Sequence, residues 1–158
     1  MDTLRSFTMN NNTVRITKEF SFEMSHLLKD HKGACKNIHG HSYKLFVTVK
    51  GIPNHAVNAP DSGMLIDFAE LKQTINSIIV EPFDHALVVS EKAYKNSFLE
   101  NYNGKLIVKP FEPTCENLIS DFARNILLSL SKTVELYSLK LYETPTSYTE
   151  WYLSDQRN

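Results

Sequence analysis

The sequence predicts one domain of the α+β class, with helices packed on one face of an antiparallel sheet. Apolar and polar residues alternate along residues 14–26 and again along 40–50, which is typical of strands that bury one face. Along residues 67–81 and 114–130, apolar residues instead recur at the spacing of an amphipathic helix. The order strand, strand, helix, short strand, helix, strand favours this class, because such a sheet needs helices to cover its apolar face.

The length and composition indicate a single globular unit. A chain of 158 residues can bury a core without disulfides or structural metals. Hydrophobic residues make up 42% of the chain and charged residues 22%, which excludes a disordered chain. Residues 1–12 are polar and rich in Asn, so we expect a loose tail there and one domain over residues 13–158.

The first two strands are predicted to be neighbours in the sheet. One face of the first strand carries Phe20, Phe22, Met24 and His26. The corresponding face of the second carries His41, Tyr43, Leu45, Val47 and Val49. The connection over residues 27–38 permits antiparallel pairing of the two strands.

Each predicted helix begins at a residue that can cap its N-terminus. Asp67 is followed three residues later by Glu70, as in a capping box, and Pro82 interrupts this helix. Thr114 caps the second helix. The expected apolar faces carry Phe68, Leu71, Ile75, Ile78 and Ile79 in the first helix, and Ile119, Phe122, Ala123, Ile126, Leu127 and Leu130 in the second.

The remaining segments are shorter. Residues 81–89 predict an irregular stretch that runs into a short apolar segment, and 105–110 predict a brief strand. A last long strand is expected over 134–143, and residues 147–153 should pair near the C-terminus. Residues 91–104 show no clear pattern.

The net charge narrows the class of binding partner, and the cysteine content argues against disulfides. Seventeen basic and eighteen acidic residues give a formal charge of −1, so we expect no nucleic acid or membrane partner and favour a small ligand. The N-terminal segment lacks the apolar core of a secretory signal, and we expect a cytoplasmic protein. Cys35 and Cys115 are too few and too far apart for a disulfide framework.

The segment CKNIHGHSY, residues 35–43, indicates a metal site. His39 and His41 lie two residues apart on a strand, so they project from the same face about 6.6 Å apart. Antiparallel pairing would bring His26 beside them, and three histidines are the ligands of an open, catalytic type of zinc site. His31 competes with His26 for the third position, but its place in a loop leaves its direction unpredicted.

The two cysteines have different interpretations. Cys35 precedes His39 by four residues, and a thiol is also a good zinc ligand, so a Cys-His-His site is an alternative. Near a dication, the Cys35 thiolate would be favoured and could act as a general base or nucleophile. An exposed thiol without a role is a third interpretation. Cys115 begins an amphipathic helix, where a cysteine is usually a small packing residue.

Two further carboxylates, those of Asp84 and Glu143, are candidate functional groups. In Asp84-His85 the carboxylate could orient the imidazole, although neighbours in sequence need not touch. Glu143 ends a mostly apolar strand, where a carboxylate is costly to bury without donors. It could accept two parallel N–H bonds from a flat amidine-like edge, as in guanine and pterin rings, or it could face water.

Six motifs together resemble the family of the 6-pyruvoyl- and 6-carboxy-tetrahydropterin synthases. The match runs from about Val14 to Trp151. The motifs, in the family's order, are FSFEMSH (20–26), CKNIHGHSY (35–43), GMLIDFAELK (63–72), FDHALV (83–88), PTCENL (113–118) and YETPTSYTEW (142–151).

This resemblance implies roles for the candidate residues. His26, His39 and His41 would hold Zn²⁺, and Cys35 would be the catalytic thiol rather than a ligand.

The resemblance extends to the second half of the chain. Asp84 and His85 match the partners of that thiol, which a neighbouring subunit contributes in the family. Glu143 matches the glutamate that anchors the pterin ring, with Thr114 and Glu116 near the same pocket.

The family's fold and reaction are implied in the same way. The fold is the tunnel fold (T-fold), a four-stranded antiparallel sheet with two helices on one face, in which three subunits close a barrel and two trimers stack as a homohexamer. The spacing CxxxHGH is similar to that of bacterial 6-carboxy-5,6,7,8-tetrahydropterin synthases, whereas animal pyruvoyl enzymes have a longer gap.

The expected activity is therefore zinc-dependent conversion of 7,8-dihydroneopterin triphosphate to 6-carboxy-5,6,7,8-tetrahydropterin, with loss of acetaldehyde and triphosphate, on the route to queuosine. Synthesis of 6-pyruvoyl-tetrahydropterin is the alternative within the family. A zinc- or pterin-binding module without turnover is the alternative outside it.

Overall fold

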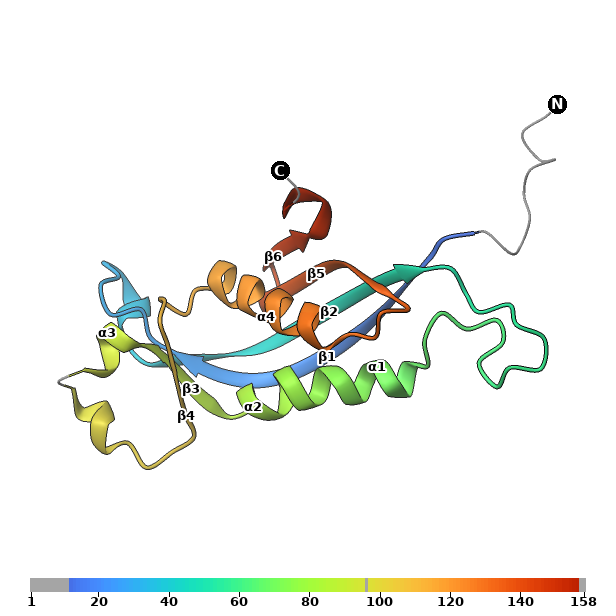
Figure 1. The fold of residues 1–158 in the computed structure, drawn as a ribbon. Helices are drawn as coiled ribbons and strands as arrows, with labels where there is room; N and C mark the ends of the chain where they lie inside the picture. The colour runs from blue at the N-terminus through green and yellow to red at the C-terminus, as the bar shows by residue number, and fades with distance from the viewer. Residues whose placement is uncertain (1–11, 96, 157–158) are drawn as a thin grey trace.

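A computed structural model describes residues 12–95 and 97–156. The loose tail predicted for residues 1–12 lies outside this range, apart from Asn12. One curved sheet of six strands, in the order β4-β3-β1-β2-β5-β6, forms the centre of the described chain (Figure 1). The strands are β1 (Val14–His26), β2 (His39–Gly51), β3 (Ala86–Ser90), β4 (Leu106–Lys109), β5 (Glu135–Thr144) and β6 (Ser147–Tyr152).

The helical segments lie in the connections between the strands. The α-helices are α1 (Phe68–Ile75), α2 (Glu81–Phe83), α3 (Glu91–Tyr94) and α4 (Cys115–Ser129). A π-helical segment, η3 (Asn76–Val80), joins α1 to α2. Short 3₁₀ segments are η2 (Ala34–Lys36), η4 (Phe98–Asn101) and η5 (Leu153–Gln156).

The expectation of a four-stranded antiparallel sheet is wrong in number and in part of its direction. Strands β1, β2, β5 and β6 do form an antiparallel sheet in that order. Strand β3, however, pairs in parallel with the end of β1, from Met24 to His26, and β4 pairs in parallel with β3. Parallel neighbours need a crossover connection, which the α1–α2 segment supplies after β2.

Both long helices cover the same face of the sheet, as predicted. The inward side chains of β1 and β2, such as Phe22 and Leu45, form one buried cluster with Ile75 of α1 and Phe122 of α4. Because successive side chains of a strand point to opposite faces and directly paired residues share a face, the even-numbered residues of β1 and the odd-numbered residues of β2 lie on this covered face. The histidines of β1 and β2 therefore point toward the helix side.

The caps of the two long helices agree with the prediction, whereas the effect of Pro82 and the burial of two apolar residues do not. Asp67 caps α1 by accepting from the Ala69 N–H, and Thr114 caps α4 by accepting from the Asn117 N–H, as expected. Pro82 does not end the helical segment, because it lies in the first turn of α2, where no backbone donor is needed. Phe68 and Leu127, assigned to the apolar faces, are 52% and 45% exposed.

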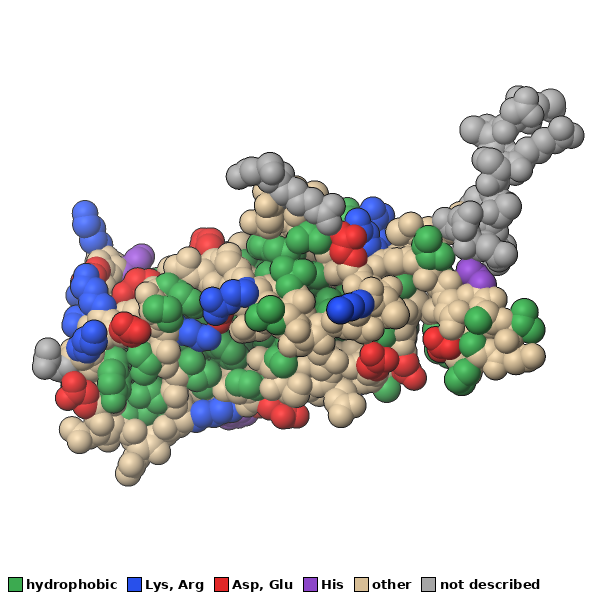
Figure 2. Space-filling model, in the orientation of Figure 1, with side chains coloured by type: hydrophobic (Ala, Val, Ile, Leu, Met, Phe, Trp, Pro, Cys, Tyr) green, Lys and Arg blue, Asp and Glu red, His purple; other side chains and the backbone are tan. Residues whose placement is uncertain are grey.

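The opposite face of the sheet has no helical cover in the described residues. It carries polar and aromatic side chains, including Lys44, Phe46 and Tyr142, and ion pairs such as Lys44–Glu19 at 3.5 Å. Hydrophobic side chains also reach the surface on the face drawn in Figure 2. Val108 on edge strand β4 is 38% exposed and Tyr148 on edge strand β6 is 48% exposed.

None of the helices in residues 12–95 and 97–156 has the length and apolar content to span a membrane.

Candidate metal centre and active site

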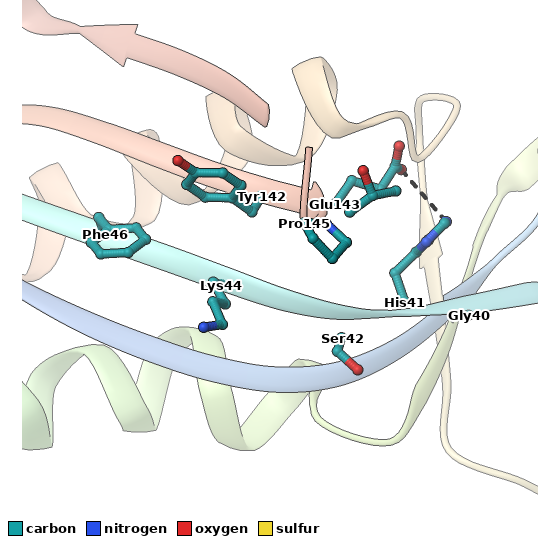
Figure 3. A pocket seen from close by; sticks show the side chains of 9 residues that line it. Gly40, His41, Ser42, Lys44, Phe46, Tyr142, Glu143 and Pro145 are labelled. Atoms are coloured by element: carbon teal, nitrogen blue, oxygen red, sulfur yellow. Dashed lines mark ion pairs between the residues drawn. The ribbon is translucent and has the colours of Figure 1, made fainter. Parts of the chain in front are cut away.

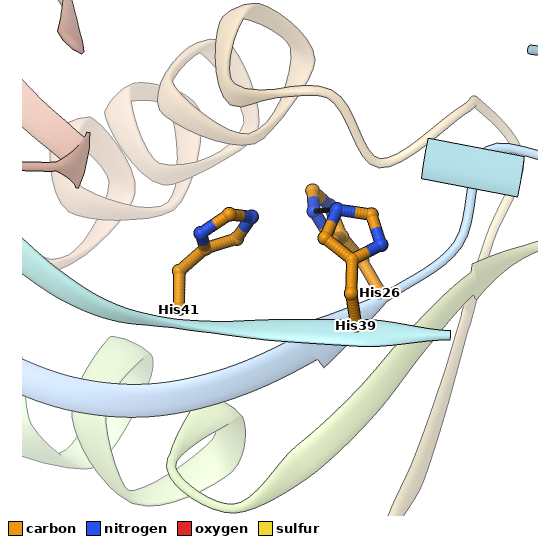
Figure 4. Close-up of side chains that lie close together, drawn as sticks. All are labelled: His26, His39 and His41. Carbon is orange, nitrogen blue, oxygen red and sulfur yellow. Dashed lines mark hydrogen bonds between the residues drawn. The ribbon is translucent and has the colours of Figure 1, made fainter. Parts of the chain in front are cut away.

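Three histidines meet at the end of the covered face because of the register between β1 and β2. His26 pairs directly with His39, and Met24 pairs with His41. Gly40 lies between the two β2 histidines, and a Cβ atom there would lie 3.0 Å from the Ser25 Oγ. Figure 4 shows the three rings gathered on one side of the two strands. The strand pairing predicted from the sequence is therefore present, and it places His26 rather than His31 beside the pair.

The ring nitrogens of the cluster converge. The Nε2 atoms of His26 and His39 lie 3.0 Å apart, and one ligand atom from each of the three rings lies within 4.8 Å of the other two. His31 is turned away and its Nδ1 accepts from the Gly33 N–H. Among the described residues, this cluster is the group of histidine, cysteine and carboxylate side chains that could hold a metal ion.

Backbone carbonyls determine which nitrogen of each ring carries the proton. The Nδ1 of His26 lies 2.8 Å from the Pro113 oxygen, and the Nδ1 of His39 lies 2.8 Å from the Asn37 oxygen. A carbonyl can only accept, so both Nδ1 atoms donate and both Nε2 atoms present lone pairs in the neutral rings. Carbonyl partners of this kind orient histidine ligands in metal sites.

Burial keeps His26 in the form that binds metals. Its side chain is 2% exposed, and burial lowers the pKa of His26 below its ordinary value, although the hydrogen bond to Pro113 opposes this change. The unprotonated Nε2 atoms of His26 and His39 face each other at 3.0 Å, where two lone pairs repel unless a proton or cation lies between them. The donor set thus fits a divalent ion with three nitrogen ligands and an open position.

Glu143 lies at the edge of this cluster. Its Oε1 atom is 3.6 Å from the His26 Nε2 and 3.9 Å from the His41 Nε2. The Tyr43 hydroxyl donates to the same oxygen at 3.3 Å. Burial, followed by the Glu143 charge, raises the pKa of Tyr43, so the hydroxyl keeps its proton. The glutamate predicted to bind a ligand therefore lies directly beside the predicted metal ligands.

A cavity of about 640 Å³ opens next to this carboxylate. Strand pairing between β2 and β5 ends at Lys44 and Tyr142, and the strands diverge beyond that pair. The cavity lies at this divergence, and its lining includes His41 and Glu143, whose side chains approach each other there (Figure 3). Its size and its mix of aromatic and charged walls suit a small aromatic ligand with polar groups.

Thr114 and Glu116 do not line the cavity. The Thr114 hydroxyl caps α4, and Glu116 is exposed in the first turn of that helix. Their neighbour Pro113 contributes instead, through its carbonyl bond to His26.

The side chains of Asp84 and His85 contact each other. The Asp84 Oδ2 lies 3.0 Å from the His85 Nδ1, and its Oδ1 accepts from the Glu23 N–H at 2.9 Å. The Glu23 N–H lowers the pKa of Asp84. His85 has a φ of 59°, a conformation that non-glycine residues rarely adopt and that is frequent at functional sites. Its ring is 76% exposed and lines a second, smaller hollow with Glu23 and Ser42 on the uncovered face.

Cys35 is not brought to these partners within one chain. It lies half-buried in the 3₁₀ segment η2, and it lines neither the cavity beside Glu143 nor the hollow beside His85. Within residues 12–95 and 97–156, no hydrogen bond joins its thiol to Asp84 or His85. Cys115, by contrast, is a buried packing residue as predicted. Burial raises the pKa of its thiol, which donates to the Leu141 carbonyl.

Sequence reasoning missed the residues that support the site. Strand alternation placed Tyr43 on the same face as His41, but no sequence pattern indicated that its hydroxyl would bind Glu143. The carbonyls of Asn37 and Pro113 act through the backbone, and residue type gave no signal for them. The Lys105 ammonium binds the carbonyls of Glu81 and Asp84 and so supports the Asp84–His85 turn.

The curved sheet with both long helices on one face defines the tunnel-fold class of proteins. An uncharacterised protein from Wolinella succinogenes superposes with a TM-score of 0.71 at 21% identity, covering 90% of this chain and 99% of that one. The 6-pyruvoyl tetrahydropterin synthase of Caenorhabditis elegans superposes with a TM-score of 0.66 at 23% identity, covering 90% of this chain and 97% of that one.

Sequence comparison then places the chain within this class. The profile of the family described as 6-pyruvoyl tetrahydropterin synthase matches residues 15–153. The 6-carboxy-5,6,7,8-tetrahydropterin synthase of Haemophilus influenzae is 38% identical, over 87% of this chain and 97% of the relative. That of Rickettsia conorii is 32% identical, over 87% and 99%. The chain belongs to the 6-pyruvoyl tetrahydropterin synthase family and is an enzyme of the lyase type.

Proposed function

We propose that this enzyme converts 7,8-dihydroneopterin triphosphate to 6-carboxy-5,6,7,8-tetrahydropterin and releases acetaldehyde and triphosphate. The observation that carries the proposal is the three-histidine cluster with Glu143 beside it at the mouth of a cavity. The spacing CxxxHGH and the names of the Haemophilus influenzae and Rickettsia conorii relatives support the carboxy product over the pyruvoyl product. The reaction would serve the cytoplasmic synthesis of queuosine and other 7-deazaguanines.

His26, His39 and His41 would hold Zn²⁺, because three imidazoles with an open fourth position are typical of catalytic zinc. Bound there, zinc would supply a Lewis acid that polarises the oxygens of the substrate side chain. The two backbone carbonyls that bind Nδ1 of His26 and His39 hold these ligands in the correct tautomer.

Glu143 would bind the pterin ring. A carboxylate can accept two parallel N–H bonds from the amidine-like edge of a pterin, which fixes the ring in one orientation. Its position beside the histidines would hold the ring next to the metal. Thr114 and Glu116 remain proposed contacts near the same pocket, although neither lines the cavity of the single chain.

Cys35, Asp84 and His85 would move the protons. The Cys35 thiolate would take a proton from the substrate, and His85, oriented by Asp84, would transfer protons on the other face. Because a single chain keeps Cys35 apart from the Asp84–His85 pair, we propose that the complete site forms between subunits of a trimer or hexamer. The hydrophobic side chains on edge strands β4 and β6 suit such an assembly.

The test is the mass of the pterin product. Purified, zinc-loaded protein is incubated with 7,8-dihydroneopterin triphosphate, and the product is identified by mass spectrometry. We expect the mass of 6-carboxy-5,6,7,8-tetrahydropterin together with acetaldehyde. The mass of 6-pyruvoyl-tetrahydropterin would assign the alternative reaction, and unchanged substrate with tight pterin binding would indicate a binding module.

The Glu143→Gln variant tests the ring-binding role. Glutamine keeps the size of the side chain but cannot accept two N–H bonds from the amidine edge. We expect weaker pterin binding with zinc retained, and unchanged pterin affinity would contradict the proposed anchor.

A further inference from the structure

We propose that Tyr43 is a positioning residue whose buried hydroxyl holds the Glu143 carboxylate beside the histidine cluster and available to the pterin ring, instead of letting it join the metal ligands. The proposal rests on the role of Glu143 in the proposed function and adds a residue to it. The Tyr43 hydroxyl donates a hydrogen bond to the Glu143 Oε1 atom at 3.3 Å.

The Tyr43 ring has no freedom to move. The residue is fully buried, with 0% exposure, and its ring stacks on Phe22 at 5.5 Å with an interplanar angle of 8°. The rings of His26 and His41 meet it edge-on at 6.3 and 5.7 Å. A hydroxyl on so constrained a ring occupies one fixed point, which makes it a suitable reference for a neighbouring carboxylate.

Glu143 needs such a restraint because of where it lies. Its Oε1 atom is 3.6 and 3.9 Å from two of the ring nitrogens, and carboxylate oxygens are themselves good ligands of zinc. A carboxylate that bound the metal would occupy the open position and would no longer face the ring edge of the substrate.

The hydroxyl of Tyr43 acts against that movement. It donates to the oxygen that lies nearest the histidines, and a buried hydroxyl that lost this acceptor would be left without a partner. Leaving a buried donor unsatisfied is unfavourable, because the hydroxyl has no water to replace the lost acceptor, and this opposes movement of Glu143 toward the metal. A charge-assisted bond of this kind also fixes the plane of the carboxylate.

The direct test is Tyr43→Phe, which keeps the stacked ring and removes the hydroxyl. Two equilibrium measurements are made on the full chain: neopterin affinity of the zinc-loaded protein by calorimetry, and Zn²⁺ affinity by competition with a chelating dye. We expect neopterin to bind about tenfold more weakly and zinc about tenfold more tightly, which corresponds to about 1.4 kcal/mol in each case. Unchanged values for both ligands would overturn the proposal.

A double variant tests whether Tyr43 acts through Glu143. In Tyr43→Phe/Glu143→Gln, both affinities should equal those of Glu143→Gln alone, because the hydroxyl then has no carboxylate to hold. If the loss of the hydroxyl weakens neopterin equally in both backgrounds, Tyr43 acts elsewhere and the proposal fails. Tyr137→Phe removes a hydroxyl from β5, where the ring packs against Arg15, and should change neither affinity.

A second variant covers the case in which Tyr43→Phe does not fold. Glu143→Asp shortens the carboxylate beyond reach of the Tyr43 hydroxyl and should also weaken neopterin binding about tenfold, and unchanged binding would contradict the proposal. Neither binding measurement requires turnover. An unexpected reaction product would thus overturn the proposed function without altering these affinities.

Discussion

The histidine cluster lies on the covered face of β1 and β2, the Asp84–His85 pair lies beside their uncovered face, and the two are assembled in different ways. The cluster forms from two long paired strands, and two of its three rings, those of His26 and His39, bond to carbonyls of the same chain. Asp84 and His85 lie on a turn with an unusual backbone, and the imidazole points into an open hollow. One region is therefore complete in a single chain, whereas the other presents a group to solvent.

This difference separates metal binding, for which one chain supplies the candidate ligands, from the proposed proton transfer, for which it does not. A metal site needs several ligands around one point, and strand register supplies them with high precision. The proposed proton transfer requires the Cys35 thiol and the His85 imidazole near one substrate, and no contact within the described chain brings them together. Metal binding should thus survive changes that abolish catalysis.

The largest effect is expected from His39→Ala. The variant removes one of three converging nitrogens, so metal bound per chain should fall from about one ion to less than about 0.1. Metal content after dialysis, measured by atomic absorption, checks this. His31→Ala is the control, because its ring bonds to the Gly33 N–H outside the cluster, and loss of metal in that variant would show that the cluster is misassigned.

The next effect is expected from Cys35→Ala. Loss of a general base should reduce kcat by about 10²–10⁴-fold while metal content stays at the wild-type level. Cys115→Ala is the matched control, because its buried thiol bonds to the Leu141 carbonyl, and it should keep kcat with only a modest loss of stability. Loss of metal in Cys35→Ala would instead make the thiol a ligand and revive the Cys-His-His arrangement.

A smaller effect is expected from Asp84→Asn. The amide oxygen can still accept from the Glu23 N–H, but the amide nitrogen cannot accept from the His85 ring, so the imidazole loses its orientation. We expect kcat to fall about tenfold to a hundredfold with metal content unchanged. Asp61→Asn, on an exposed loop, should have wild-type kinetics. Wild-type kcat in Asp84→Asn would remove the pair from the mechanism.

The smallest effect concerns the pH dependence of the metal-free protein. Burial lowers the pKa of His26 in the folded state, so the unfolded chain binds a proton more readily. The contribution of His26 to stability is therefore present above the unfolded value of 6.5 and is lost as the pH falls through the lower, folded pKa. Urea unfolding between pH 7.5 and 5 should show this slope, and the slope should be smaller in His26→Asn. Equal slopes in the two proteins would contradict it.

The sequence was sufficient to predict the cluster because its geometry depends on regular structure. Alternation placed His39 and His41 on one face, and the connection over 27–38 brought His26 opposite His39. Both helix caps were read correctly from Asp67 and Thr114, because capping is a local interaction between a side chain and the next turn.

The remaining features depend on contacts that no local pattern records. The parallel pairing of β3 with β1 follows from the path of the α1–α2 crossover rather than from the apolar run itself. The approach of Glu143 to the histidines arises where β2 and β5 stop pairing. Apolar spacing also cannot tell which end of a helix leaves the core, so Phe68 and Leu127 were expected to be buried and are exposed.

The most direct test of the account is to mix two inactive variants, Cys35→Ala and His85→Ala, both of which should keep their metal. After unfolding and refolding together, some sites would combine the thiol of one chain with the imidazole of another. If the complete site lies between subunits, a one-to-one mixture should recover up to about a quarter of wild-type activity. If each chain uses its own Cys35 and His85, the mixture will stay inactive, and the proposed division between a complete metal centre and a shared proton-transfer site will be contradicted.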